Sequence, residues 1–399
     1  MKLHPLPARV AARGFSLIEL MVSMVIALTV IVAMTMVSAR FETSKRQDAT
    51  TADLSTNSGY LSYDFDRQLR SAGSGFSAVN RAETFGCALY ATKAGARILP
   101  APSAFPAPFA TVDTTMRMLP VLAFAGAGSG GSDVLQVMTG TGGIGETSSQ
   151  MRLRSATAAN FRLTTTVGIR GDDLLLVTEN GRPCMLEQVD AGYTGGVSQQ
   201  VDLAGAYYAG TIGTESITDR STGATANAAV LGNASNGNPP KLMLLGVNAT
   251  NQLVRYDLLR FTNGASEAPV PLSDGVVDMR VRYGVDTTGT PDGVLDAWVA
   301  PTGGTYGSAA LNAGTTAATA TMGRILAVKV SLVLRSEFRE TKDATDVVVA
   351  PATMTMFPSL PTSLQASYTV TDRSRRHRVL EFTIPLRNAL ANSGRAAPP

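Results

Sequence analysis

An uninterrupted apolar segment near the N-terminus restricts the fold of this chain more than any other feature. Phe15 to Val37 are 23 residues in which Glu19 is the one charged side chain. As a helix the segment would be about 34 Å long at ~1.5 Å per residue, which matches a bilayer core of about 30 Å. Lys2, Arg9 and Arg13 precede it, and no acidic residue does. The positive-inside rule therefore keeps the first residues in the cytoplasm and places the chain after Val37 outside.

A cleaved secretory signal peptide is the alternative, with Val37-Ser38-Ala39 as its small-residue cleavage site. The apolar segment is longer than the roughly 7–15 residues of such a peptide's apolar region. Glu19 also costs up to about 2.5–3.5 kcal/mol within a bilayer, a cost that a signal peptide has no reason to carry. An ionisable side chain in a membrane segment indicates function, so we expect Glu19 to have a partner.

The sequence around Glu19 resembles a known motif. Gly14-Phe15-Ser16-Leu17-Ile18-Glu19-Leu20 is similar to the prepilin motif of type IV pilins and type II secretion pseudopilins. The resemblance implies that prepilin peptidase removes residues 1–14 as a cytoplasmic leader by cutting after Gly14, and then methylates the new N-terminus, Phe15. It also implies that Glu19 docks subunits by pairing with the free amine of a neighbouring subunit, because two charges that are costly alone offset one another when paired.

The residues after the apolar segment have helical periodicity. Apolar residues recur at spacings of seven and four, at Leu54, Leu61, Phe65 and Leu69. Tyr60 and Tyr63 are expected to broaden this face, and Gly73 and Gly75 to end it. We therefore predict one helix from Phe15 to Ala72. Residues 15–37 form a transmembrane or filament-core half, and residues 38–72 form an amphipathic half that packs on a globular domain.

Residues 73–399 are predicted to form a β-rich head outside the inner membrane. Its apolar runs predict strands at 133–138, 173–178, 241–246, 253–261, 276–283, 325–334 and 378–386. In the strand at 325–334, apolar residues at 328, 330 and 332 alternate with Lys329 and Ser331, which predicts a half-exposed strand. Residues 204–240 and 300–323 are expected to be loops, and the proline-rich residues 96–120 an extended connector. The fold class is α+β and pilin-like, a long N-terminal helix packed on a large antiparallel β-rich head.

The C-terminal third extends the resemblance. Residues 274–286, 324–335 and 378–388 are similar, in amino-acid sequence and in their order along the chain, to segments of PilW-type minor pilins. This implies a minor pilin that helps to prime or cap the type IV pilus and is not an enzyme. The implied partners are prepilin peptidase, other minor pilins, the major pilin and the assembly platform of the bacterial inner membrane. The chain would be a single-pass protein with a periplasmic head, and later a subunit of the extracellular pilus. A type II secretion pseudopilin and a pilus-tip adhesin stay open as alternatives.

Catalysis and nucleic-acid binding have little support in the residues. A dinucleotide site requires a helix directly after its glycine motif. No helix is predicted after the glycine motifs at 126–131 and 140–145. His4 and His377 are the only histidines, and no G-x-S-x-G occurs, so an enzyme tethered by the anchor is the least supported option. Loss of the three leader charges takes the net charge from +3 to zero. The basic run Arg373–Arg378 lacks aromatic residues for base stacking and is expected to be a solvated loop before a strand. Membrane lipid is an expected partner, and nucleic acid is not.

Two pairings remain to be tested. Cys87 and Cys184 are the only cysteines, and such a pair in an exported chain predicts a disulfide, the alternative being two buried thiols. Asp286, Asp292 and Asp296 surround Gly293 in a pattern that partly fits a calcium loop. Thr288 replaces one expected ligand, and the spacing is about two residues longer than in such a loop. A Pro-Asp-Gly turn closing a hairpin is the alternative. No other cofactor is expected.

Overall fold

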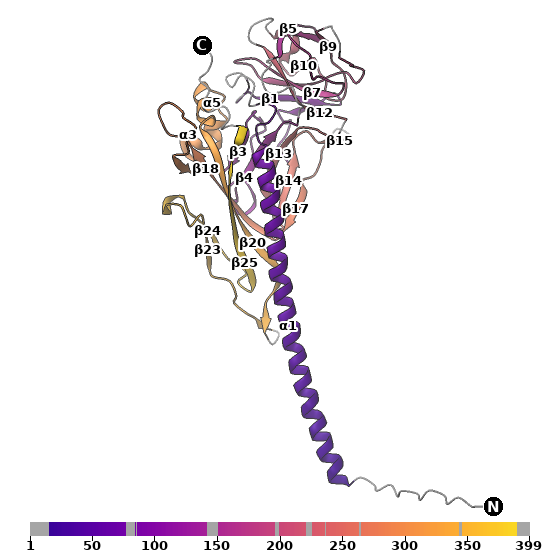
Figure 1. Cartoon of the computed structure of the whole chain (residues 1–399), viewed down its shortest axis with the longest axis vertical. Coiled ribbons are helices and arrows are strands. Elements are labelled where there is room, and N and C mark those ends of the chain that lie inside the picture. Colours follow the sequence, from indigo (N-terminus) through magenta and orange to yellow (C-terminus); the bar gives the residue numbers. More distant parts are fainter. Residues whose placement is uncertain are drawn as a thin grey trace, which may run out of the picture. The chain divides into compact units, whose positions relative to one another are not determined.

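The structure is a computed structural model that describes residues 16–76, 84, 86–141, 151–195, 199–220, 226–235, 237–262, 265–342 and 345–388. The chain divides into two compact units, Met1–Asp53 and Leu54–Pro399. Helix α1 (Leu17–Arg70) begins in the first unit and ends in the second. The predicted long N-terminal helix is confirmed, and it is followed by the antiparallel β-rich region that the fold class requires (Figure 1).

The second half of α1 buries the face that its sequence predicts. Leu54, Leu61, Phe65 and Leu69 are all buried. The expectation that Tyr60 and Tyr63 broaden this face is wrong, since their side chains are 50% and 66% exposed. A helix turns about 100° per residue, so positions one before and two after Leu61 point away from its face.

The end of α1 is held by residues far along the chain. Gly73 has φ of +83°, a left-handed conformation that favours glycine, and its N–H donates to the Met138 carbonyl at 2.8 Å. Nδ2 of Asn388 donates to the carbonyls of Ser71 and Ala72, at 3.4 and 2.9 Å. The Asn388 side chain thus donates to carbonyls just beyond the last helical residue, where the helix provides no further N–H groups.

Within the described residues, the strands form three larger sheets. The eight-stranded sheet has the order β2 (Ala96–Leu99), β1 (Leu89–Lys93), β8 (Cys184–Gln188), β7 (Asp173–Thr178), β12 (Asn227–Asn233), β5 (Met151–Ala156), β6 (Asn160–Leu163) and β9 (Gln200–Asp202). The five-stranded sheet has the order β17 (Val270–Asp274), β14 (Gln252–Asp257), β13 (Lys241–Val247), β4 (Val134–Thr139) and β3 (Val121–Phe124). The four-stranded sheet has the order β19 (Ala297–Val299), β18 (Val276–Val285), β20 (Ile325–Arg339) and β25 (Arg375–Pro385).

Shorter elements connect these sheets. The two-stranded ribbons are β10 (Thr211–Ile212) with β11 (Glu215–Ser216), β15 (Phe261–Thr262) with β16 (Ala265–Ser266), β21 (Thr341–Lys342) with β22 (Thr345–Asp346), and β23 (Thr353–Met356) with β24 (Ala366–Thr369). The short helices are η1 (Ser129–Gly131), η2 (Ile217–Asp219), α3 (Gly303–Tyr306), α4 (Ser308–Leu311), α5 (Thr316–Met322) and η3 (Thr362–Leu364).

The main hydrophobic core joins the second half of α1 to the sheets. Leu61 and Phe65 belong to the same buried cluster as Leu135 of β4 and Val330 of β20. The Phe65 ring also lies 5.1 Å, centroid to centroid, from the ring of Phe382 on β25. The second half of the helix is therefore an integral layer of the second unit.

The central strands β8, β7 and β12 of the eight-stranded sheet are buried on both faces. Along β7, Leu174 and Leu176 join the main core, whereas Leu175 and Val177 join a second core. Burial on both sides explains why the sequence Asp-Leu-Leu-Leu-Val-Thr is a continuous apolar run instead of an alternating one.

All seven predicted strands are present, with changes at their ends. The strand expected at 253–261 stops at Asp257, because the Asp257 carboxylate accepts the Leu259 N–H at 3.0 Å and turns the chain. Strand β25 begins at Arg375, so the prediction of a solvated loop at Arg373–Arg378 is wrong for most of that run. Its basic residues follow one another along a strand that pairs with β20.

The three predicted connectors contain more structure than expected. In 204–240, β12 is a buried strand built largely of small residues, which local composition cannot separate from a loop. In 300–323, three short helices form, and the Thr315 hydroxyl caps the last by accepting the Ala318 N–H. In 96–120, β2 is a strand, and Phe105 and Phe109 are buried against Tyr256.

The prediction that the strand around Lys329 and Ser331 is half-exposed is wrong at Ser331. Ser331 is buried, because a third cluster containing Phe357, Met356 and Leu360 covers the face of β20 opposite the main core. The Ser331 hydroxyl donates to Glu381 at 3.4 Å, which lets a polar side chain remain in this position.

Replacing Leu61 by alanine should destabilise the head. Leu61 is fully buried in the main core, and such truncations cost about 2–5 kcal/mol. Thermal unfolding of the full chain in detergent measures the loss. Tyr63→Ala on the same helix is the matched control and should change the stability by less than about 0.5 kcal/mol. Equal losses for both variants would contradict the assigned face.

Candidate functional site

The N-terminal end of α1 contains a capping arrangement around Glu19. Ser16 precedes the first helical residue, and its N–H donates to Oε2 of Glu19 at 3.5 Å. The first helical bond runs from the Leu20 N–H to the Ser16 carbonyl at 3.1 Å. A serine followed three residues later by glutamate is the sequence of a capping box, in which the glutamate reaches back to the backbone at the cap. The carboxylate thus lies beside the backbone of Ser16, at the start of the helix.

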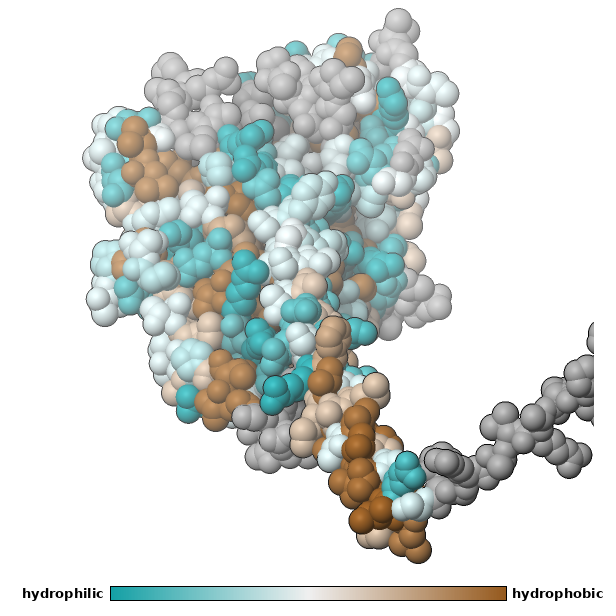
Figure 2. All heavy atoms as spheres, turned by 60° about the horizontal axis from the view of Figure 1, so that its bottom comes forward, coloured by the Kyte–Doolittle hydropathy of each residue, from teal (hydrophilic) through white to brown (hydrophobic). Residues whose placement is uncertain are grey.

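The first half of α1 is apolar and exposed. All its large hydrophobic side chains from Leu17 to Val37 are exposed, and Figure 2 shows this segment largely in brown. Of the helices in the described part of the chain, α1 alone is long and apolar enough to cross a membrane. This half of the helix carries the surface that a lipid or helix-bundle environment would cover.

Hydroxyl groups on the same segment are satisfied internally. Ser23, Thr29 and Thr35 each donate to the carbonyl three residues earlier, at 2.8–2.9 Å. A hydroxyl that bonds to its own helix does not need water, so these polar residues are compatible with an apolar surrounding. Glu19 is the exception, because its charge requires a partner. Gly14 and Phe15, the predicted cleavage and methylation residues, lie outside the described residues.

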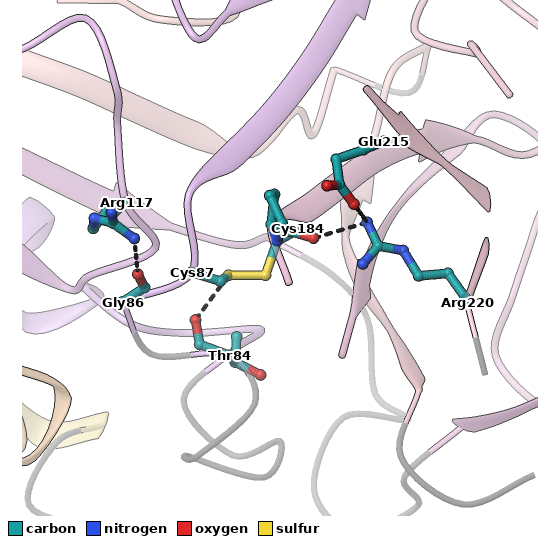
Figure 3. The surroundings of a disulfide bond; sticks show 8 residues. Thr84, Gly86, Cys87, Arg117, Cys184, Glu215 and Arg220 are labelled. Carbon is teal, nitrogen blue, oxygen red and sulfur yellow. Dashed lines mark hydrogen bonds and ion pairs between the residues drawn. A yellow bond between two sulfur atoms is a disulfide. The ribbon is translucent and has the colours of Figure 1, made fainter. Parts of the chain in front are cut away.

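The predicted disulfide between Cys87 and Cys184 is present (Figure 3), with a Cα–Cα distance of 5.6 Å. It joins the start of β8 to the residues before β1, next to the parallel register in which Leu89 faces Cys184. In the described part of the chain this is the one parallel pair. The bond closes a long loop, since the cysteines are separated by 97 positions, and the chain-entropy model gives such closure up to about 4.7 kcal/mol.

Two arginines secure the backbone on either side of this bond (Figure 3). Nη1 of Arg117 donates to the Gly86 carbonyl at 2.7 Å. Nη2 of the fully buried Arg220 donates to the Pro183 carbonyl at 2.9 Å and lies 3.3 Å from Oε2 of Glu215. Burial lowers the pKa of both guanidinium groups, which remain charged because an arginine pKa is ordinarily above 12.

Glu187 is a buried carboxyl group three residues beyond Cys184. Its Oε2 accepts the Ala209 N–H at 3.0 Å, and its Oε1 has no hydrogen-bond partner among the described residues. Burial raises the pKa of Glu187 to about 8, against the opposing effects of the Ala209 bond and the charge of Arg220. The carboxyl group is therefore mostly neutral at pH 7 in the folded protein.

Glu187→Gln should make the folded protein less sensitive to pH. The pKa of Glu187 rises from 4.5 to about 8 on folding, so the unfolded chain loses this proton at lower pH than the folded one. Stability therefore falls as pH rises from about 4.5 to 8, by on the order of a few kcal/mol in total. Melting temperatures of the variant should decline less across this range, and the gain over wild type should be largest at pH 8.

An exposed carboxylate on β20 supplies the control for this measurement. Glu337→Gln removes the same charge at an exposed position, so its melting curve should keep the wild-type dependence on pH. A Glu187→Gln protein with the wild-type pH dependence would overturn the assignment of a buried neutral carboxyl group.

The predicted calcium residues lie in the loop between β18 and β19. Asp286 is fully buried, and its Oδ2 accepts the N–H groups of Asp292 and Gly293, both at 2.9 Å. Its Oδ1 accepts the N–H and the hydroxyl of Thr288, at 3.1 and 2.6 Å. Burial acts to raise the pKa of Asp286, but these hydrogen bonds outweigh it and hold the pKa below its ordinary value.

The other two aspartates of this loop also accept hydrogen bonds within it. Oδ2 of Asp296 accepts the Thr287 N–H at 2.7 Å, and Oδ1 of Asp292 accepts the Val294 N–H at 2.9 Å. Among the described residues, no three His, Cys, Asp or Glu side chains converge as a metal site would require. Calcium binding at these three residues stays a prediction.

The remaining candidate motifs take structural positions. Residues 126–131 form a turn and the 3-10 segment η1 before β4, where the Gly126 N–H donates to buried Asp133 at 3.0 Å. The second glycine motif, residues 140–145, extends beyond the described residues. His377 lies within β25, with Nδ1 2.9 Å from the Arg375 carbonyl, and burial lowers its pKa.

Comparison with known families gives two matches. Residues 231–388 match the family model of type IV pilus-assembly protein W, and residues 9–35 match the prokaryotic N-terminal methylation motif. The first match spans the strands from β13 to β25 and the loop at Asp286, and the second spans Gly14, Phe15 and Glu19. Neither a curated protein nor a solved structure matches the chain.

Proposed function

We propose that this chain is a minor pilin of the type IV pilus machinery, because residues 231–388 match the type IV pilus-assembly protein W family and residues 9–35 match the N-terminal methylation motif. Its contribution is assembly instead of catalysis. It enters the filament through the first half of α1, and its head helps to prime the filament or to cap its tip.

One observation carries this proposal. The methylation motif includes the start of α1, where the apolar side chains are exposed. The same helix continues into a segment whose apolar side chains are buried in the core of the head. A cleavable signal peptide gives no reason for such a continuous helix, because the anchor would be removed from the mature protein. A filament subunit needs both parts, an apolar stem that other stems can cover and a head attached to that stem.

The pairing role of Glu19 is inferred from its position. Its carboxylate lies near the backbone of Ser16 at the start of α1. Cleavage after Gly14 would create an amine at Phe15, one residue before Ser16. In a bundle of apolar stems, the amine of an adjacent subunit offsets the cost of burying this carboxylate. The proposed partners are thus prepilin peptidase, other minor pilins, the major pilin and the inner-membrane assembly platform. Before assembly the stem spans the inner membrane, with the head in the periplasm.

Mass spectrometry of the mature protein tests the processing step. Cleavage after Gly14 should yield an N-terminal, N-methylated Phe15. A Gly14→Ala variant should accumulate as the uncut precursor, because the cut site in the family motif directly follows that glycine. A mature protein that begins at Arg40 would instead show signal-peptide cleavage after Ala39 and remove the basis for a pilin.

Replacing Glu19 by alanine separates processing from docking. We expect the variant to be cut and to reach the inner membrane, since the apolar segment becomes more hydrophobic. Its content in sheared pili, measured by immunoblot, should fall at least about tenfold, as for the loss of an interaction of roughly 1.4 kcal/mol. Glu42→Ala, an exposed carboxylate farther along the same helix, is the control and should be incorporated normally.

Gene deletion distinguishes this function from its two alternatives. Loss of surface pili on electron micrographs, restored by the wild-type gene, indicates a priming minor pilin. Normal piliation with lost attachment to surfaces indicates a tip adhesin. Normal piliation with loss of exported enzymes from the medium indicates a type II secretion pseudopilin.

A further inference from the structure

Backbone oxygens of the loop between β18 and β19 converge on one cation, the side chain of Arg324. Nη1 of Arg324 donates to the Thr288 carbonyl at 2.5 Å, and Nη2 donates to the Gly289 carbonyl at 3.0 Å. Nη1 also lies 3.4 Å from the Asp286 carbonyl and 3.9 Å from Oδ1 of the Asp286 carboxylate. Three carbonyls and one carboxylate thus surround a single positive charge.

The backbone holds Arg324 in this position. Arg324 lies between the C-cap of α5 at Gly323 and the first residue of β20, and its carbonyl accepts the Asp286 N–H at 3.0 Å. The residue is therefore tied to the loop through both its main chain and its side chain. Arg324 directly precedes β20, a strand that pairs along most of β18.

The acidic side chains are arranged for donors instead of a metal ion. Both oxygens of Asp286 already accept two bonds each from N–H or O–H groups of the loop. Calcium needs six to eight oxygen ligands, and a carboxylate surrounded by donors offers it little. A planar guanidinium has several N–H donors and suits convergent carbonyls better.

We propose that Arg324 is a built-in cation that holds the loop 286–296 in its folded form without a metal ion. The loop then has a fixed shape at any calcium concentration. It presents Val294 and Leu295, which are 56% and 39% exposed, on a firm base. This role of Arg324 concerns the loop alone and is independent of the proposed role in pilus assembly.

Removing the guanidinium should loosen this loop selectively. In full-length protein in detergent, Arg324→Ala should lower the melting temperature by about 2–4 °C. Hydrogen exchange at the amides of Thr288, Asp292 and Gly293 should accelerate at least about tenfold, because their acceptor Asp286 loses its charge partner. Ethylguanidinium at millimolar concentration should restore part of both losses by occupying the vacated space.

Two controls make the result specific. Arg154→Ala, an exposed arginine on β5, should leave exchange in the loop unchanged and show no response to ethylguanidinium. Arg324→Lys keeps the charge with fewer directed donors, so it should show a smaller acceleration. If Arg324→Ala does not accumulate, the lysine variant and the wild type still give the decisive measurements.

Calcium titration of the wild type provides the opposing outcome. Neither calcium at 5 mM, about the weak end of extracellular sites, nor a chelator should change its melting temperature or the exchange of these amides. Stabilisation by calcium would mean that a metal ion binds in the loop, as the spacing of Asp286, Asp292 and Asp296 predicts. That result would overturn the proposal. Unchanged exchange in both Arg324 variants would overturn it as well.

Discussion

The burial of one face of α1 is the interaction on which the rest of the structure depends. Leu61 and Phe65 occupy the same core as strands of the five-stranded and four-stranded sheets. The head cannot complete its core without the second half of this helix. The first half of the same helix has the opposite character, since its apolar side chains are exposed. One helix therefore combines a face that is buried in the core of the head with a segment whose apolar side chains are exposed.

The C-terminus of the described chain completes this arrangement. Asn388 donates to carbonyls at the end of α1, and β25, which precedes it, packs Phe382 against Phe65. The first and last elements of the head are thus in direct contact. This gives a physical reason for the C-terminal segment in the PilW match, because its last residues supply donors that the helix cannot provide for itself.

Three buried or half-buried arginines of the head act on the backbone. Arg117 and Arg220 donate to carbonyls on either side of the disulfide, and Arg324 donates to carbonyls of the 286–296 loop. The guanidinium group suits this use, since it stays charged when buried and has several donors in a fixed plane. Glu187 behaves differently, because burial favours its neutral form.

The sequence by itself determined the long apolar N-terminal helix, the buried face of α1, the seven predicted strands and the Cys87–Cys184 pair. Each depends on local periodicity, on a short motif or on the presence of only two cysteines, all of which can be read from the unfolded chain. Only the tertiary structure decided the strand β12, the burial of Phe105 and Phe109, and the partners Asn388 and Arg324. The small residues of β12, the two phenylalanines within a proline-rich stretch and the single polar side chains of Asn388 and Arg324 have no distinctive local pattern. Arg324 meets Thr288 across 36 positions, and Asn388 meets Ala72 across 316. Such contacts exist only once the sheets have formed, because sheet pairing brings distant segments together while periodicity reports one element at a time.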